Sequence, residues 1–464
     1  MSDVKWKAVH SAWLEEGGRR LDCNPYMSGA LEARDALKRL SCRKDKLRDV
    51  TTAMFDSGRE SRKWVSDSRF GTRFMGSTAI GLAEMSKLPL IANKQVARNP
   101  KLVLEHGWSL ITRSGSIGRM AYVRPDMVGL ACSEDVLRVV PDTSLIPSGY
   151  LYAFLSSRYG VPLVVAGTYG AIIQHIEPEH IADLPVPRFG AAFEAEIHQL
   201  IDESARLRSA ANETLSETLA ELEVAAGFSM VELPQVTELS CSSVMLSSLN
   251  DRFDAPYHSA AALSAEEMLD RSPLGVASLP DVVKRYFKPP IFKRLWVDGE
   301  EYGRQFVSGV DIYRYQSEEP RYVSSRTPKF DEFLLERGMV VFQAAGQIYG
   351  LFARPLYVNG WLEGAFCADD VFRIAPFTEE DGAFLYLFLR TKVGEALIKR
   401  QACGNSIPRV WEPHISRLRV LWPEPAVRKS FAKPVIEAHE MIEQARQAEL
   451  KAVRLLEQKI KGGT

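Results

Sequence analysis

The chain lacks a long hydrophobic run, a strong net charge and closely spaced cysteines. Among its 464 residues no stretch approaches the 18 or more apolar residues of a membrane span, and its first residues lack the apolar core of a signal peptide. The formal net charge of -1 excludes a uniformly basic nucleic-acid coat but not a local basic face. The six cysteines are scattered without a C-x-x-C pair, which indicates reduced thiols in a cytoplasmic protein.

Catalytic motifs are missing as well. Asn24-Pro25-Tyr26 resembles the loop with which DNA adenine methyltransferases hold a flipped base, but it lacks the second proline. The later Ala255-Pro256-Tyr257 also lacks the polar residue that would bind the target amine. No glycine-rich turn after a strand offers a site for S-adenosylmethionine, and the eight histidines show no metal-ligand spacing. We therefore expect no catalytic residue, bound cofactor or metal in this chain.

What the chain does contain is an internal repeat. KLRDVTTAMFDSGRESRKWV (46–65) aligns with SLPDVVKRYFKPPIFKRLWV (278–297) without a gap. Further matches follow in the same order: 105–118 with 336–350, 132–139 with 367–374, 150–160 with 384–394, and 170–186 with 404–420. Each half of the chain therefore holds the same series of pieces, which predicts a duplicated fold.

Each half ends in a sequence with heptad spacing. Apolar and small residues recur with heptad spacing over 190–226, and again over 425–461. They are Phe193, Ile197, Leu200, Ser204, Leu207 and Ala211 in the first segment, and Phe431, Val435, Ala438, Ile442, Ala445, Ala452 and Leu456 in the second. This pattern predicts two helices, each about 50 Å long at 1.5 Å per residue, that bury their apolar stripes against each other as a coiled coil. The alternative is that each helix packs separately on a globular domain. The polar, serine-rich residues 227–249 between the halves are interpreted as a linker.

Within each half, short helices and short strands alternate. The segments 31–40 and 265–271 are typical of short helices, and GYLYAFLSS (149–157) and GAFLYLFLR (382–390) of helices packed on a sheet. The runs SLIT, AYV, VLRVV, MVVF, LFA and VFRI predict strands. SGSIG (114–118) lacks the lysine of a phosphate-binding loop and is interpreted as a tight turn between strands. The fold class expected is α+β, with a mainly β core in each half.

Basic residues gather at the same place in both halves, beside aromatic residues and glycines. In nucleic-acid binders such residues contact phosphates, which positions the protein without specifying a sequence. The alternatives are a solvated surface or, for the two arginines that precede a tryptophan by two residues, a structural role. The clusters comprise Arg59, Arg62, Lys63, Arg69 and Arg73 in the first half, and Lys284, Arg285, Lys288, Lys293 and Arg294 in the second.

The order of these duplicated motifs resembles the DNA-specificity subunits of type I restriction-modification enzymes, over nearly the whole chain. The residues that carry the resemblance are the starts Arg20–Asp22 and Arg252–Asp254, the L-x-D-V segments, the Gly115 and Gly346 turns, and the closing segments at Gly170 and Gly404. The helices begin with LPVPRFGAAFEAEI and LWPEPAVRKSFAKP instead of the family's usual P-P-x-x-E-Q. This departure leaves open a relative in another methylation-linked phage-defence system.

The resemblance implies a fold and a function. It implies target-recognition domains at 1–189 and 250–424, spacer helices at 190–226 and 425–464 that pair antiparallel, and an internal pseudo-twofold. The protein is then a non-catalytic subunit that binds a bipartite site in double-stranded DNA. It docks two DNA methyltransferase (modification) subunits, which bind the S-adenosylmethionine, and in systems that also restrict it docks a restriction or translocase subunit. The alternative is a duplicated scaffold protein without sequence-specific DNA binding.

Base-reading residues are expected in loops that match in position but differ in side chain between the halves. A scaffold position should be the same in both copies, whereas a position that reads two different half-sites should differ. The loops are 113–119 and 169–175 in the first half, and 343–349 and 405–409 in the second. The candidates are Arg113, Ser116, Arg119, Tyr169, Gln174 and His175, with Gln343, Gln347, Tyr349, Asn405 and Arg409.

Overall fold

The computed structural model divides the chain into two compact units that share both long helices. Unit 1 comprises Met1–Ser209 with Gln444–Thr464, and unit 2 comprises Ala210–Glu443. The structure describes residues 6–16, 24–83, 85, 87–166, 175–229, 233, 241, 243–249, 252–316, 320–348, 350–404 and 406–463. No helix in these ranges is both long and apolar enough to cross a membrane.

Unit 1 contains three small sheets. In the first four-stranded sheet, with strand order β2-β9-β6-β7, every neighbouring pair is antiparallel. In the second, with order β3-β5-β4-β8, the last pair is parallel. A two-stranded ribbon pairs β1 with β10. The strands are β1 (Lys44–Lys46), β2 (Thr51–Phe55), β3 (Trp64–Val65), β4 (Gly71–Met75), β5 (Leu90–Ala92), β6 (Ser109–Thr112), β7 (Met120–Tyr122), β8 (Ala131–Cys132), β9 (Val136–Pro141) and β10 (Pro185–Pro187).

Unit 2 repeats these sheets strand for strand. Its orders are β12-β19-β16-β17 and β13-β15-β14-β18, and its ribbon pairs β11 with β20. The one parallel pair, β14 with β18, stands where β4 pairs with β8 in unit 1. The strands are β11 (Val276–Ser278), β12 (Val283–Phe287), β13 (Trp296–Val297), β14 (Gly303–Val307), β15 (Tyr322–Ser324), β16 (Val340–Gln343), β17 (Leu356–Tyr357), β18 (Phe366–Cys367), β19 (Val371–Pro376) and β20 (Arg419–Leu421).

Even the irregularities are duplicated. The register shifts between Thr51 and Ala53 where β2 pairs with β9, and between Val283 and Arg285 where β12 pairs with β19. A bulge inserts one residue into a ladder and bends the strand, so it seldom falls at the same place by chance. The shared strand orders and shared bulges confirm the duplication that the sequence predicts.

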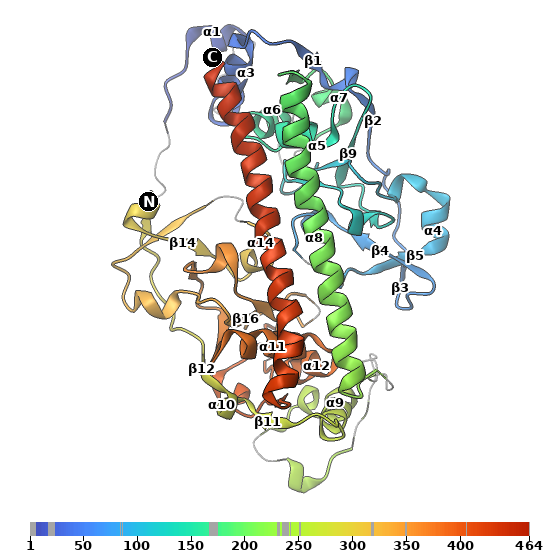
Figure 1. Ribbon diagram of the computed structural model, residues 1–464, viewed down its shortest axis with the longest axis vertical. Coiled ribbons are helices and arrows are strands. Elements are labelled where there is room, and N and C mark those ends of the chain that lie inside the picture. Colours follow the sequence, from blue (N-terminus) through green and yellow to red (C-terminus); the bar gives the residue numbers. More distant parts are fainter. Residues whose placement is uncertain are drawn as a thin grey trace. The chain divides into compact units, whose positions relative to one another are not determined.

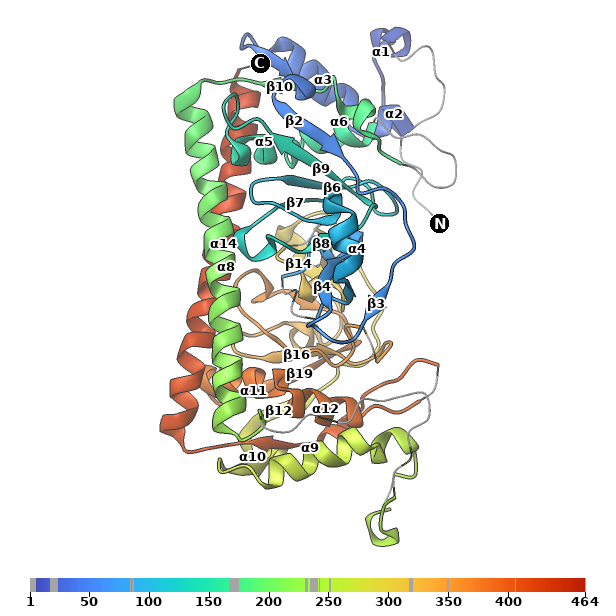
Figure 2. The same ribbon diagram turned by 90° about the vertical axis from the view of Figure 1, so that its right-hand side faces the viewer.

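The short helices follow from local sequence. Helix α5 (Ser148–Leu155) is buried on all sides, as its apolar sequence predicts, and in unit 1 it lies between the first four-stranded sheet and the long helices (Figure 2). Helix α11 (Glu379–Arg390) occupies the same place in the sequence of unit 2. The other helices are α1 (Ser11–Glu16), α2 (Asn24–Met27), α3 (Ala30–Arg39), α4 (Asn93–Arg98), α6 (Gly160–Ala166), α7 (Pro178–Ile181), α9 (Ala260–Asp270), α10 (Leu279–Val282), α12 (Lys392–Arg400) and α13 (Glu412–Ile415).

The two long helices are α8 (Ala191–Ala225) and α14 (Pro425–Gly462). In unit 1 the first part of α8 shares a core with the last part of α14, and in unit 2 the last part of α8 shares a core with the first part of α14 (Figure 1). Helices that meet in this order within each unit run antiparallel. The pairing confirms the coiled coil and excludes the alternative of separate packing.

The seam of α14 has the predicted phase, and the seam of α8 has it at every second position. Ile197, Ser204 and Ala211 of α8 are buried as predicted. Val435, Ala438, Ala445, Ala452 and Leu456 of α14 are fully buried. On α8 the predicted Leu200 and Leu207 are only half-buried, because the neighbouring Ile201 and Arg208 face the core instead. Arg208 is accommodated there by an ion pair with Glu449 of α14, in which Nη2 lies 2.7 Å from Oε2.

Two other predictions differ from the structure or lie outside it. The run LFA (351–353) is wrong as a strand: only Phe352 forms an isolated bridge, and β17 begins at Leu356. Residues 230–232, 234–240 and 242 of the linker, and the start motif Arg20–Asp22, lie outside the described residues. The strands predicted from SLIT, AYV, VLRVV, MVVF and VFRI coincide with β6, β7, β9, β16 and β19.

Candidate nucleic-acid interface

A tryptophan, a phenylalanine and an arginine form the same contact in both units. Trp64 meets Phe74 edge-on, with ring centroids 5.3 Å apart, and Trp296 meets Phe306 at the same 5.3 Å. The guanidinium of Arg62 lies 5.0 Å from the Phe74 ring, and that of Arg294 lies 5.4 Å from the Phe306 ring. Arg62 and Arg294 therefore take part in duplicated cation–π contacts, which is the structural role that the sequence left open.

A second duplicated arginine was not recognised from the sequence. Arg138 of β9 and Arg373 of β19 are fully buried, and each guanidinium donates to backbone carbonyls of the turn that precedes its strand. The acceptors include the carbonyls of Ser133 and of Cys367. Burial lowers the pKa of both guanidinium groups. The available signal was the same charged residue inside the apolar runs VLRVV and VFRIA.

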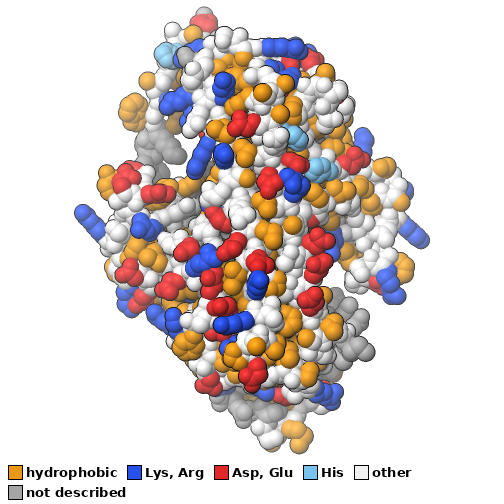
Figure 3. Space-filling view, viewed as in Figure 1, with side chains coloured by type: hydrophobic (Ala, Val, Ile, Leu, Met, Phe, Trp, Pro, Cys, Tyr) orange, Lys and Arg blue, Asp and Glu red, His pale blue; other side chains and the backbone are white. Residues whose placement is uncertain are grey.

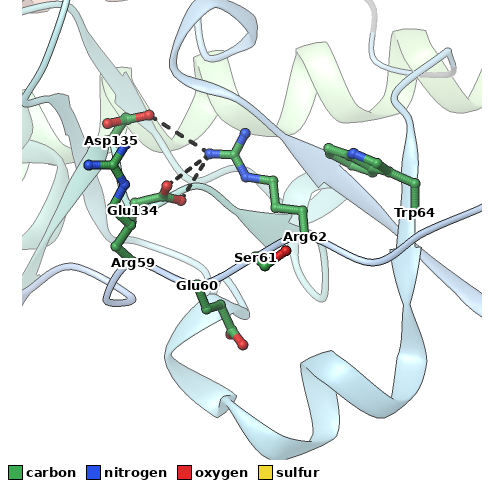
Figure 4. Close-up of a pocket in the computed structure, with 7 residues that line it drawn as sticks. All are labelled: Arg59, Glu60, Ser61, Arg62, Trp64, Glu134 and Asp135. Atoms are coloured by element: carbon green, nitrogen blue, oxygen red, sulfur yellow. Dashed lines mark hydrogen bonds and ion pairs between the residues drawn. The ribbon is translucent and has the colours of Figure 1, made fainter.

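A hollow of about 610 Å³ lies beside Arg62 in unit 1 (Figure 4). Arg62 crosses it and binds Glu134, with Nη2 3.0 Å from both carboxylate oxygens, and donates to Ser133 Oγ at 3.1 Å. Arg59 lies on the side of Glu134 and Asp135, and Trp64 lies on the opposite side. Because Arg138 binds the carbonyl of Ser133, the buried arginine fixes the turn that carries these carboxylates.

The predicted loops meet within each unit. In unit 1, Ser114 of the 113–119 turn bridges His175, and in unit 2, Ala345 bridges Arg409 in the same antiparallel sense. The turn SGSIG connects β6 and β7, as predicted, and Gly115 and Gly118 both take the left-handed backbone conformation that a tight turn requires. In each unit the described residues of the two loops that are candidates for base reading are therefore paired.

Within the first pair of loops the candidate residues differ in exposure. Ser116 is exposed, whereas Arg119 and His175 are half-buried. Arg113 is largely buried: its Nη1 lies 3.0 Å from Asp56 Oδ2, its Nη2 pairs with Glu177, and its Nε donates to the carbonyl of Ile176. These contacts join the turn 113–119 to the residues that follow His175.

In the second pair of loops, Gln347 and Arg409 are exposed, and Gln343 is half-buried at the end of β16. Gln347 Nε2 donates to the carbonyl of Ser406 at 3.4 Å, which joins the two loops. The backbone of Arg409 exchanges two hydrogen bonds with Cys403, so its backbone is held while its side chain faces solvent. The remaining candidates Tyr169, Gln174, Tyr349 and Asn405 lie outside the described residues.

The predicted basic clusters divide into exposed and engaged side chains. Arg69 binds Asp67 through two nitrogens, Arg285 stacks on Phe287 at 3.8 Å, and Lys288 lies 5.6 Å from the Trp411 ring. Apart from Arg62 and Arg294, whose contacts are described above, the other members are all exposed: Arg59, Lys63, Arg73, Lys284 and Lys293. The clusters are therefore partly held in place by neighbouring side chains and partly available to a ligand.

The motif Arg252–Asp254, at the start of the second half, has a structural role. Arg252 binds Asp254 and donates to the carbonyl of Ala402 at 2.8 Å. The hydrogen bond from Arg252 lowers the pKa of the Asp254 carboxyl. Tyr257 lies between Arg252 and Arg400, whose guanidinium groups are 4.7 Å and 4.1 Å from its ring. The motif therefore fastens the beginning of the domain to the segment after α12.

The long helices present acidic side chains on the face seen in Figure 3. In unit 2, Glu213, Glu217 and Glu221 follow one another at four-residue spacing on α8, and all three are exposed. Like charges at this spacing destabilise a helix slightly and repel phosphate. This stretch of α8 is therefore unsuited to contact DNA.

No protein-family model and no curated protein matches the chain. Solved structures that are similar to it include three that each match over 91% of this chain. The type I restriction-modification S subunit from M. genitalium is 11% identical, with 95% of that chain covered and a TM-score of 0.38. The HsdS subunit from Thermoanaerobacter tengcongensis is 12% identical, with 96% covered and a TM-score of 0.28. A chain from a structure on complex assembly and conformational transition of the type I R-M system is 12% identical, with 96% covered and a TM-score of 0.29. Because these TM-scores lie below 0.5, the function proposed below depends on the chain's own residues.

Proposed function

We propose that this chain is a non-catalytic DNA sequence-recognition subunit that binds a bipartite site and directs adenine methylation by two docked methyltransferase subunits. The observation that carries the proposal is that the two halves share a scaffold but differ in their exposed loop residues. The same sheets, bulges, Arg–Trp–Phe contacts and buried arginine occur twice, whereas the exposed side chains on the equivalent loops differ. A duplicated scaffold with divergent loops is what two different half-sites require.

The chemistry of the loops fits base reading in the major groove. Glutamine forms paired hydrogen bonds with adenine and arginine with guanine, and each such pair contributes about 1–3 kcal/mol of discrimination. Gln347 and Arg409 are exposed on loops whose backbones are held together. Ser116, Arg119 and His175 occupy the corresponding loops of unit 1. We assign Arg113 to positioning these loops, since its guanidinium is engaged by Asp56 and Glu177.

Phosphate contacts complete the surface. Lys63, Arg73 and Lys293 are exposed next in the chain to residues of the duplicated Arg–Trp–Phe contacts, and Lys284 is exposed on β12. Lysine and arginine side chains of this kind release counterions from DNA and supply affinity that falls with salt. Recognition domains at 1–189 and 250–424, joined by the helices at 190–226 and 425–464, would each read one half-site.

The partners follow from what the chain would need in order to act. Residues 1–464 contain no motif for binding S-adenosylmethionine, so methyl transfer would require a DNA methyltransferase that brings the cofactor. A duplicated chain offers two equivalent docking surfaces, one for each methyltransferase subunit. A restriction or translocase subunit would join in a system that also cleaves. The complex would act in the cytoplasm, on double-stranded DNA.

The first test is selection of bound duplexes from random-sequence DNA with the purified full chain, alone and with a DNA adenine methyltransferase from the same genome. We expect enrichment of two half-sites separated by a fixed gap, and methylation only when the methyltransferase is present. A chain that associates with the methyltransferase but enriches no sequence would contradict the proposal and favour the duplicated scaffold protein.

A matched pair of variants separates base reading from phosphate binding. Arg409→Ala should relax the preference at one position of one half-site, because a base contact is lost. Lys284→Ala should weaken binding to all sequences and lower the slope of log affinity against log salt by about 1. Equal losses on cognate and random DNA for Arg409→Ala would remove Arg409 from the base-reading set.

A further inference from the structure

The residue three positions before the duplicated arginine differs sharply between the units. It is Arg59 in unit 1, three residues before Arg62, and Ile291 in unit 2, three residues before Arg294. The two positions are equivalent in structure as well as in sequence, because Arg62 and Arg294 make the same cation–π contact to the equivalent strands β4 and β14.

Both side chains face solvent. Ile291 is 85% exposed. Arg59 is exposed on the rim of the hollow beside Arg62, opposite Trp64 (Figure 4). Within the part of the chain that the structure describes, Arg59 forms no hydrogen bond or ion pair. Its donors are therefore available to a ligand, unlike those of Arg62, which bind Glu134.

The backbone that leads to each of these residues is restricted. In unit 1, Asn99 Nδ2 donates to the carbonyl of Ser57 at 2.8 Å, and Gly58 takes the left-handed conformation at φ 72°. In unit 2, Pro289 and Pro290 precede Ile291; their rings fix φ at both prolines and keep Lys288 and Pro289 extended, so the chain that leads to Ile291 is stiff. Fixed presentation lowers the entropy lost on binding, which favours specific contact over loose attraction.

The next residue points inward in both units, which fixes the outward direction of the first. Glu60 accepts from Asn99 Nδ2 at 3.1 Å and lies 3.5 Å from Arg98. Phe292 packs on Phe333 and Phe366, with ring centroids 4.5 Å and 5.1 Å apart. Residues 60 and 292 therefore differ for reasons internal to the fold, whereas no hydrogen bond or ion pair among the described residues explains the difference between Arg59 and Ile291.

We propose that Arg59 and Ile291 are specificity-determining residues, one for each half-site, an inference that rests on the function proposed above. The guanidinium of Arg59 has the paired donors that bind O6 and N7 of guanine, and the Ile291 side chain supplies an apolar contact for the methyl group of thymine. Trp64 and Trp296 then hold equivalent segments at the edge of each small sheet, whereas the residue that contacts the base differs between the two units.

The test exchanges the two residues in the full chain and repeats the selection from random duplex DNA. Arg59→Ile should remove the preference for guanine at one position of one half-site, a loss of about 5-fold to 100-fold in discrimination. Ile291→Arg should create a preference for guanine at one position of the other half-site. Because a gained preference cannot come from misfolding, Ile291→Arg keeps the proposal testable if Arg59→Ile is unstable.

Arg59→Lys is the matched control for charge. Lysine keeps the positive charge but loses the planar pair of donors, so the guanine preference should weaken while the salt dependence stays constant. An unchanged motif for either exchange variant, or an equal loss on all sequences, would overturn the assignment of that residue. If the unmodified chain enriches no motif, the function proposed above fails as well, which distinguishes the two failures.

Discussion

The small sheets of the two units share one strand order but are held by different chemistry. Beside β4 of unit 1 the parallel partner of Phe74 is Ala131, and beside β14 of unit 2 the parallel partner of Phe306 is Phe366. Unit 1 compensates with polar contacts, in which Arg62 binds Glu134 and Asn99 binds Glu60. Unit 2 instead packs five phenylalanines together: Phe292, Phe306, Phe330, Phe333 and Phe366.

The helix seam differs in the same way. In unit 1, Glu449 of α14 receives a charged hydrogen bond from Arg208 and a hydrogen bond from the hydroxyl of Tyr152 at 2.6 Å. In unit 2, His439 of α14 lies between Tyr357 and Tyr386, with ring centroids 4.8 Å and 5.1 Å away. The hydrogen bonding between strands therefore preserves the fold, although the side chains that stabilise it differ between the units. The exposed loops can then acquire different specificities.

The largest effect should come from the phenylalanine cluster. Phe366→Ala should lower the free energy of unfolding by about 4 kcal/mol, because it removes a fully buried ring that contacts four other rings. The measurement is urea denaturation of the full chain, with Phe70→Ala as the control, since Phe70 is 64% exposed. A loss below about 1 kcal/mol would show that the cluster does not hold the sheet.

Acid should destabilise the chain through His439. Burial, together with the nearby charge of Arg390, lowers the pKa of His439 from 6.5 to about 4. The histidine of the unfolded chain binds a proton below pH 6.5, whereas that of the folded chain does so only near pH 4. The neutral, buried His439 therefore contributes its full stability above pH 6.5, and this stability is lost as the pH falls toward 4. The loss reaches about 3 kcal/mol. His439→Phe should flatten the dependence of stability on pH in this window, and parallel profiles for the two proteins would contradict the prediction.

The ion pair in the seam of unit 1 should have a smaller effect. Glu449→Gln should lower the free energy of unfolding by about 2 kcal/mol, because Arg208 then remains largely buried without its counter-charge. Glu457→Gln removes the more exposed pair with Arg158 and should change stability by less than about 1 kcal/mol. Thermal denaturation of both variants makes the comparison, and equal effects would argue against a special role for Arg208.

The smallest effect should come from the side-chain hydrogen bonds of Asn99 in unit 1. Asn99→Ala removes hydrogen bonds to the Ser57 carbonyl and to Glu60, and should lower the free energy of unfolding by about 1 kcal/mol. The same variant frees the segment that carries Arg59, so discrimination at one base should fall more than overall DNA affinity. If Asn99→Ala selects an unaltered motif, the hydrogen bonds of Asn99 do not contribute to base reading.

The sequence predicts the repeat and the long helices well because both depend on regular spacing. The phase of α14 follows from its alanines and valines. On α8 the positions predicted at Ile197, Ser204 and Ala211 are correct, but Leu207 is misjudged because an arginine, Arg208, occupies that seam position. Arg138 and Arg373 escape notice because a buried guanidinium that binds carbonyls has no local signature. The contacts of Arg113 with Asp56 and Glu177 join residues far apart in the chain, so only the folded structure reveals them.

The central claim is that two similar units read two half-sites at a separation set by the paired helices. It is tested most directly by deleting one matched heptad from each helix, residues 209–215 and 442–448, which adjoin the paired Arg208 and Glu449. Seven residues span about 10 Å of helix, which corresponds to about three base pairs of B-DNA. The deletion variant should select the same two half-sites with a gap shorter by about three base pairs. An unchanged gap between unchanged half-sites would contradict the account.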